Sequence, residues 1–104
     1  MGMIADMNLQ AWLETNSAAH PPMVTPYIQS AESQRIRYQL YAVRKGASGT
    51  SRVGQSGAVM ARAGQPTALS RFSLNVGQGD KCRIALTLVT ARQTRKSYDF
   101  DCPR

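Results

Sequence analysis

Residues 35–44 alternate between apolar and polar side chains, and this pattern constrains the fold more than any other feature of the chain. An alternation with a period of two places successive side chains on opposite faces of a β-strand, so one face is buried and the other is solvated. The expected buried set is Ile36, Tyr38, Leu40 and Ala42, and the expected solvated set is Arg35, Arg37, Gln39 and Tyr41. The segment therefore predicts one strand of a sheet that covers a hydrophobic core.

Six further segments are rich in β-favouring residues and are separated by clusters of Gly, Ser and Pro. They are residues 8–14, 23–30, 55–63, 67–76, 81–91 and 97–102. The first also fits a short helix, and Pro26 restricts the second to a sheet edge or a bulge because proline cannot donate to a ladder. Residues 45–51 have the composition of a turn or loop. About seven short strands at this spacing predict an all-β fold, a single immunoglobulin-like β-sandwich.

The length of 104 residues is that of one domain. We expect a core that spans residues 7–102, preceded by residues 1–6 as a flexible or non-native start. No secretory signal is visible at the N-terminus, and no apolar run approaches the roughly 20 residues of a membrane span. The expectation is a monomeric protein, in a mature form, that does not insert into a membrane.

The last two predicted strands allow a test of register. If they form a hairpin centred near Arg92, the numbers of opposed residues sum to 184, and Cys82 lies opposite Cys102 on the apolar face. A disulfide there would close a loop of about 21 residues and stabilise the fold by roughly 3 kcal/mol. The alternative is two buried thiols that only pack. The matching register favours the disulfide and, with it, an oxidising compartment.

The net charge of +7 is unevenly distributed, because all 13 basic residues lie in residues 35–104. Two predicted strands that are neighbours in an immunoglobulin-type sandwich carry cations on their solvated faces. These cations are Arg35, Arg37, Lys81 and Arg83, with Gln39 and Tyr41 as hydrogen-bonding groups beside them. We expect one basic patch for an acidic partner, partly neutralised because Arg83 opposes Asp101. The alternative is a solvated surface that only keeps the protein in solution.

Few residues are available for catalysis or metal binding, since the chain has one histidine, two cysteines and six carboxylates. His20 lies in a polar loop without a nearby acidic or nucleophilic residue, whereas a general base needs an orienting partner. Residues 46–49 match the GxxG loop of KH domains, but they are not set between predicted helices and are more simply a turn. The sequence therefore predicts no enzyme, no catalytic residue, no cofactor and no metal site.

Three segments occur in a characteristic order: Arg37-Tyr-Gln-Leu-Tyr-Ala-Val-Arg-Lys-Gly46, then Ser48-Gly49-Thr50-Ser51, then Gln65-Pro66-Thr-Ala68-Leu69-Ser-Arg-Phe-Ser73-Leu74-Asn75. This ordered set, within residues 34–91, resembles the curli-assembly chaperone family, CsgC and its relative CsgH. The enterobacterial branch of the family carries a Cys-X-Cys at the start of its third strand, where this chain has Gln34-Arg35-Ile36. The resemblance is therefore closer to CsgH and implies no oxidoreductase role.

The resemblance implies a periplasmic sandwich that keeps the curli subunit CsgA, or a similar amyloidogenic protein, from forming amyloid before export. Curli-type subunits resemble acidic, Gln- and Asn-rich repeats that stack into cross-β structure, so the implied contact is electrostatic and comes from the basic strand face. Two alternatives stay open. One is a small basic β-domain that binds single-stranded nucleic acid, although seven aromatic residues make a thin stacking platform. The other is an adhesin-like sandwich whose free edge strand pairs with a partner.

Overall fold

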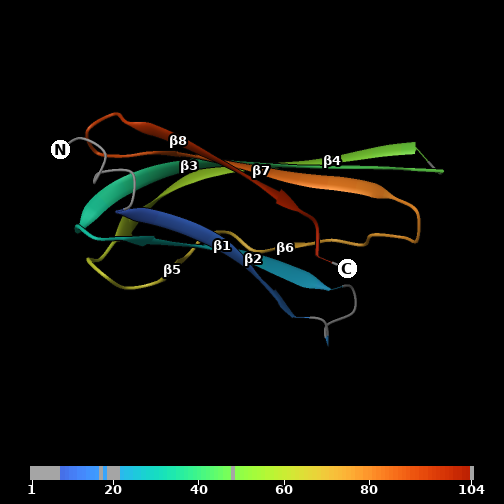
Figure 1. The fold of residues 1–104 in the computed structure, drawn as a ribbon, viewed down its shortest axis with the longest axis horizontal. Coiled ribbons are helices and arrows are strands. Elements are labelled where there is room, and N and C mark those ends of the chain that lie inside the picture. Colours follow the sequence, from blue (N-terminus) through green and yellow to red (C-terminus); the bar gives the residue numbers. More distant parts are fainter. Residues whose placement is uncertain (1–7, 17, 19–21, 48, 104) are drawn as a thin grey trace.

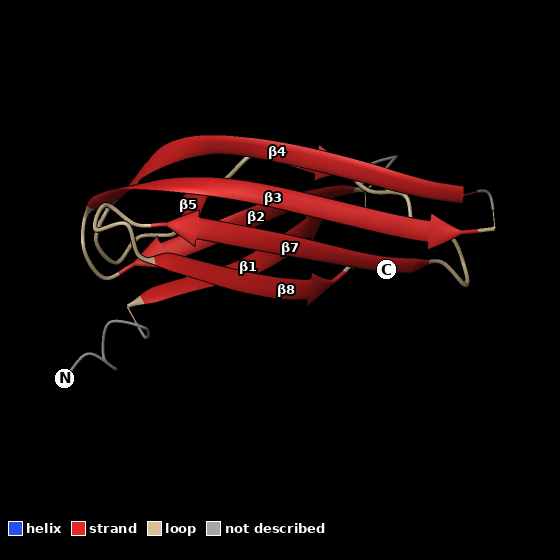
Figure 2. Cartoon of the chain, turned by 90° about the horizontal axis from the view of Figure 1, so that it is seen from above, coloured by secondary structure: helices blue, strands red, loops and turns tan. Residues whose placement is uncertain are grey.

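Strand β3 (Gln34–Gly46), which contains the alternating segment, is an inner strand of one of two sheets. The computed structural model describes residues 8–16, 18, 22–47 and 49–103. Strand β3 pairs with β4 (Gly49–Ala61) on one side and with β7 (Lys81–Val89) on the other, and β8 (Arg95–Asp101) completes the order β4-β3-β7-β8. All three pairings are antiparallel. Figure 2 shows these four strands side by side, with β4 outermost.

The second sheet is built around β2 (Met23–Ser30). Strand β2 pairs with β1 (Leu9–Asn16) on one side and with β5 (Thr67–Ala68) and β6 (Phe72–Ser73) on the other. The two sheets stack as two layers (Figure 1), which confirms the predicted all-β sandwich. Within the described residues there is no helix with the length and apolarity to cross a membrane. Residues 1–6 and His20 lie outside the described residues.

The core lies between the sheets and is formed by the predicted buried faces of the strands. The side chains at 1% exposure or less include Ile36 and Leu40 of β3, Ile84, Leu86 and Leu88 of β7, and Val24 and Ile28 of β2. Burial of one aliphatic side chain of this size contributes about 1.5–3 kcal/mol. The alternation in β3 is therefore set by this core, and it leaves the intervening side chains of β3 on the opposite face of the sheet.

The predicted turn at residues 45–51 is wrong in extent. Strand β3 continues to Gly46 and β4 begins at Gly49, where the two strands pair directly. Gly, Ser and Thr at the start of β4 have the composition of a loop, but pairing along 13 residues of β3 holds them in a strand. Gly49 has a φ of +120°, which a residue with a Cβ rarely adopts. The hairpin therefore turns more tightly than its composition indicates.

The segment 67–76 was predicted as one strand and instead contains two strands of two residues each, β5 and β6. The break lies beside Pro26 of β2. The carbonyl of Pro26 accepts a hydrogen bond from the Leu69 amide at 2.8 Å, but proline has no N–H to return one. Strand β2 is also an inner strand, so the prediction that Pro26 restricts it to an edge or bulge is wrong. The ladder between β2 and strands β5 and β6 is therefore interrupted at the position where Pro26 has no N–H to donate.

The hairpin of β7 and β8 has the predicted register. Arg83 pairs with Asp101, and Ile84 pairs with Phe100, so opposed numbers sum to 184. Cys82 and Cys102 form a disulfide with a Cα–Cα distance of 5.4 Å. Their buried positions at the end of the hairpin tie the C-terminal strand to β7.

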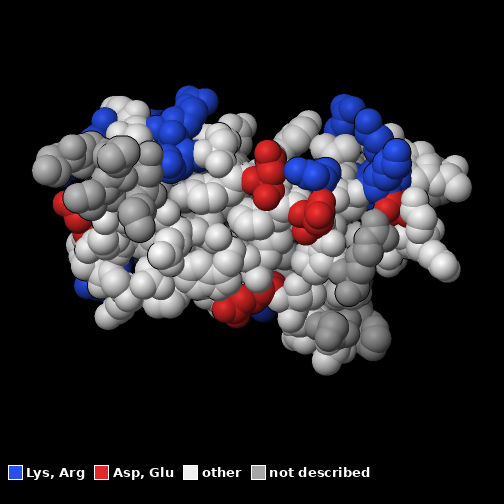
Figure 3. Space-filling view, in the orientation of Figure 1, with Lys and Arg blue, Asp and Glu red and all other residues white. Residues whose placement is uncertain are grey.

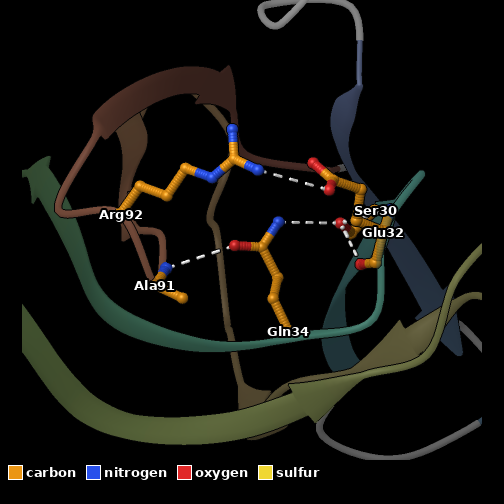
Figure 4. Close-up of polar contacts among 5 residues, drawn as sticks. All are labelled: Ser30, Glu32, Gln34, Ala91 and Arg92. Carbon is orange, nitrogen blue, oxygen red and sulfur yellow. Dashed lines mark hydrogen bonds and ion pairs between the residues drawn. The ribbon is translucent and has the colours of Figure 1, made fainter.

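A polar junction joins the two sheets at the end where β2 leads into β3 (Figure 4). The hydroxyl of Ser30, a fully buried residue, accepts a hydrogen bond from the Gln34 side-chain amide at 3.0 Å. The side-chain oxygen of Gln34 accepts a hydrogen bond at 3.1 Å from the backbone amide of Ala91, in the β7–β8 turn. The Arg92 guanidinium forms an ion pair with the Glu32 carboxylate, at 3.6 Å, across the same junction. These contacts hold the β7–β8 turn against the start of β3.

Candidate functional site

The residues selected from the sequence all lie on one surface, the side of sheet β4-β3-β7-β8 that is turned away from the other sheet. We call it the outer face. Arg35, Arg37, Gln39 and Tyr41 of β3 and Lys81 and Arg83 of β7 are exposed there. Strands β3 and β7 are hydrogen-bonded neighbours, as predicted. The sheet places these side chains on a rigid surface, because the opposite side of each strand is fixed in the core.

The four predicted cations do not form one patch. In the antiparallel register of β3 and β7, Arg37 lies opposite Val89, whereas Arg83 lies opposite Val43. We call residues that pair side by side across the sheet a row. The rows of Arg37 and Val43 are six residues apart along β3, and at about 3.4 Å per residue this separation is about 20 Å. Exposed charges are screened over about 8 Å at physiological ionic strength, so the two groups act as separate charges. The expectation of a single patch is wrong. Strands β3 and β7 are neighbours but antiparallel, so the cations at the start of β3 and those at the start of β7 lie at opposite ends of the sheet.

The first group, which we call the turn-end cluster, consists of Arg35, Arg37 and Arg95. Arg95 of β8 lies in the same row as Arg37, because both pair with Val89. The Arg37 guanidinium donates to the Gln93 side-chain oxygen at 3.1 Å, so the β7–β8 turn orients it. An open depression of about 600 Å³ lies beside this cluster and is lined in part by Arg37, Arg95 and Ser56.

The second group, the hairpin-end cluster, consists of Lys45, Arg52, Lys81 and Arg83. Lys45 lies directly opposite Lys81 across β3 and β7. Like charges in directly opposed positions destabilise a sheet, so this pairing has no structural benefit of its own. Arg83 donates to Asp101 at 3.2 Å, the pair predicted from the hairpin register. Both side chains are mostly exposed, so the pair contributes about 0–1 kcal/mol and leaves Arg83 able to exchange partners.

A neutral to acidic strip separates the two clusters. It contains Gln39 and Tyr41 in the middle of β3, with Ser56 of β4 and Ser97 of β8 in the row of Gln39. Asp99 of β8 lies in the row of Tyr41. Along the upper side of the molecule in Figure 3, Lys and Arg gather toward both ends and acidic residues lie between them.

The outer face offers the chemistry of binding. Its functional groups are exposed guanidinium and ammonium ions, hydroxyl and amide groups, and the carboxylates of Asp99 and Asp101 on β8. Among the described residues, there is no group of three or more His, Cys, Asp or Glu that could hold a metal ion. Arginine presents a planar set of donors that suits carboxylates, and each exposed contact of this kind is weak. The arrangement therefore favours many weak, salt-sensitive contacts with an acidic partner over one tight site.

Sequence reasoning missed three cations of the outer face: Lys45, Arg52 and Arg95. Lys45 has the same parity as Arg35 and Arg37, and a longer predicted strand would have included it. Arg95 follows from the hairpin register that located the disulfide. Arg52 could not be found in this way, because the segment that carries it was predicted as part of the connection between strands.

Residues 3–97 match the profile of the Tafi-CsgC family, described as thin aggregative fimbriae synthesis protein. The chain is similar to the curli assembly protein CsgC of Escherichia coli strain K12, with 28% identity over 98 residues. The aligned part covers 94% of this chain and 89% of that relative. The CsgC of E. coli O1:K1 matches to the same extent.

Two solved structures have a similar fold. The E. coli curli protein CsgC superposes with a TM-score of 0.75 at 26% identity, covering 88% of this chain and 97% of that one. The solution structure of R. palustris CsgH gives a TM-score of 0.72 at 22% identity, covering 89% and 91% of the two chains. The likeness to CsgH concerns the fold. Both proteins therefore share the sandwich architecture of this chain.

Proposed function

Because the chain belongs to the Tafi-CsgC family of thin aggregative fimbriae synthesis proteins, we propose that it acts in curli assembly as a non-enzymatic periplasmic chaperone. Its client is the curli major subunit CsgA or a similar amyloidogenic protein, whose amyloid nucleation it delays. The similar E. coli proteins are curli assembly proteins, which supports this assignment. The Cys82–Cys102 disulfide supports the compartment, since disulfides persist in oxidising environments such as the periplasm.

The observation that carries the proposal is the pair of cationic clusters on one rigid face. The turn-end and hairpin-end clusters are about 20 Å apart, and an extended segment of about six residues spans that distance. An acidic segment can therefore contact both clusters only while it is extended. Each contact is weak and exposed, so the client exchanges quickly. A segment held in this way is withdrawn from the stacked strands of a cross-β nucleus.

The test is the aggregation lag of purified CsgA, followed by thioflavin-T fluorescence with this protein well below equal stoichiometry. We expect the wild-type protein to lengthen the lag. Arg35→Glu with Arg37→Glu reverses two charges of the turn-end cluster and is expected to shorten the lag toward that of CsgA alone. Arg62→Glu with Arg71→Glu is the matched control, because it makes the same charge change at exposed positions outside the four strands of the outer face.

The hairpin-end cluster is tested separately with Arg52→Glu and Lys81→Glu. Neither residue pairs with Asp101, so the change adds no acidic pair to the β7–β8 ladder. If both clusters take part, each double variant loses part of the lag extension, and raising the salt concentration several-fold reduces the wild-type effect. An unchanged lag in every cluster variant, or no effect of salt, would show that the contact is not electrostatic.

A further inference from the structure

Strand β4 is a sheet edge that lacks the usual protection against pairing with another chain. It has 13 residues, no proline and a single charged residue, Arg52. Among the described strands it pairs with β3 alone (Figure 2). Soluble proteins normally shorten such edges or place charges, prolines or bulges on them. The register of β4 against β3 is continuous from Gly46–Gly49 to Gln34–Ala61, so no bulge interrupts it.

The hydrogen-bonding direction of β4 follows from the rest of the sheet. In an antiparallel sheet, successive residues direct their N–H and C=O groups alternately to one neighbour and to the other. The Cys102 amide donates to the Cys82 carbonyl, so the even-numbered residues of β7 face β8 and the odd-numbered ones face β3. Odd-numbered residues of β7 pair with odd-numbered residues of β3, so the even-numbered residues of β3 face β4. These pair with odd-numbered residues of β4, so the odd-numbered residues of β4 face β3 and the even-numbered ones face outward. The outward-facing residues are Thr50, Arg52, Gly54, Ser56, Ala58 and Met60.

The other edges differ from β4. Strand β8 has seven residues, of which four are charged, and such charges oppose pairing. Strands β5 and β6 have two residues each. Strand β1 has eight residues with Glu14 as its only charge, and its Leu9 carbonyl accepts a hydrogen bond from the Tyr98 hydroxyl at 3.1 Å. Strand β4 is therefore the longest edge of the described residues and the one with the least protection.

The charge around β4 selects the chemistry of its partner. Residues 34–61, which form β3, β4 and their turn, contain five basic residues and no acidic one. A second copy of this chain would bring two such basic hairpins together, which like-charge repulsion disfavours. An acidic strand would be attracted instead. Tyr41 and Met60, at 48% and 61% exposure, are the exposed large hydrophobic residues of the described chain, and both lie on the outer face of β3 and β4.

We propose that β4 is a strand-pairing edge that takes an extended acidic segment of the client as an added antiparallel or parallel strand. The inference rests on the proposed function and specifies the surface that performs it. Backbone hydrogen bonds along the edge give affinity that does not depend on the client's exact sequence. Alternate side chains of the added strand lie on the side of the outer face, where Arg52 of β4 can contact its carboxylates. Recognition by backbone and charge suits a client made of acidic, Gln- and Asn-rich repeats.

The decisive comparison uses two proline substitutions, at two positions in one row of the sheet. Ser56 of β4 and Ser97 of β8 lie in the row of Gln39, both are exposed, and both direct their N–H groups away from the sheet. Proline is tolerated in an edge strand where its missing N–H would have faced solvent. Ser56→Pro therefore removes one donor from the proposed docking edge, and Ser97→Pro removes one from the opposite edge. Neither change alters the charge.

In the thioflavin-T assay with CsgA, Ser56→Pro is expected to lose most of the lag extension, while Ser97→Pro keeps it. Circular dichroism and the melting temperature verify that both variants are folded. If wild type and both variants lengthen the lag equally, strand pairing at β4 is refuted and the proposed function stands. If the wild-type protein has no effect on the lag, the proposed function itself fails. Equal loss in both variants would also overturn the assignment to β4.

A second measurement does not depend on the folding of a variant. In a ¹⁵N NMR titration of the wild-type protein with a soluble acidic, Gln- and Asn-rich peptide, the largest amide shifts are expected in β4, with smaller shifts in β8, where Arg95 and the Arg83–Asp101 pair lie. The same peptide with its Asp residues replaced by Asn should bind more weakly, because only its charge has changed. Shifts confined to other strands would refute the proposal. Shifts of β4 that depend on protein concentration without peptide would assign the edge to a second copy.

Discussion

Removal of the Cys82–Cys102 disulfide should lower the free energy of unfolding by about 3 kcal/mol. The two cysteines are 20 positions apart, so the bridge closes a loop of about 21 residues. The chain-entropy relation for a loop of that length gives about 11 cal/mol/K, or about 3 kcal/mol at 25 °C. For a domain of this size, such a loss lowers the melting temperature by roughly 12–24 °C.

The assay is urea unfolding of oxidised and reduced wild-type protein, followed by circular dichroism. Reduction keeps both sulfur atoms in place, so the comparison isolates the effect of the cross-link on the unfolded chain. The double variant Cys82→Ala with Cys102→Ala should lose somewhat more, because both residues are buried in the core, at 7% and 6% exposure. A reduced protein within about 1 kcal/mol of the oxidised one would refute the assumption that the unfolded hairpin is unstructured.

Three further predictions concern packing and charge. Gly46→Ala should destabilise the protein by about 1–3 kcal/mol in urea unfolding, because a Cβ at Gly46 would collide with the Asp80 side chain, which caps a turn and pairs with an arginine. A loss below about 0.5 kcal/mol would mean that this carboxylate moves freely. Leu86→Ala should cost about 2–5 kcal/mol by calorimetry, because Leu86 is fully buried between the sheets. Asp101→Ala should change stability by less than about 1 kcal/mol, because its pair with Arg83 is exposed, and a larger loss would contradict that reading.

Much of the outer face could be predicted from the sequence. The period-two pattern of β3 identified Arg35, Arg37, Gln39 and Tyr41 as one exposed set, because burial of the alternate residues determines which side of a strand faces solvent. The same reasoning placed Lys81 and Arg83 on the neighbouring strand. What it lacked was the position of β7 along β3, and with it the separation of the cations into two clusters.

The missed parts share one physical cause. Arg52 lies in a stretch of Gly, Ser and Thr that has no strong preference for a strand and becomes one by pairing with β3. The open edge of β4 follows from the order of the strands, which depends on the packing of the two sheets. Local propensity is weak in such a segment, so its structure is decided by its neighbours.

The amino-acid sequence by itself determined the buried faces of β3 and β7, the register of the β7–β8 hairpin and the disulfide. These features depend on side-chain period and on a short connection, and both act over a few residues. The tertiary structure alone decided where β7 lies along β3, how the ladder breaks beside Pro26, and that β4 is left at an edge. Strands joined by long connections find their register through the shape of the shared core, which no local pattern encodes.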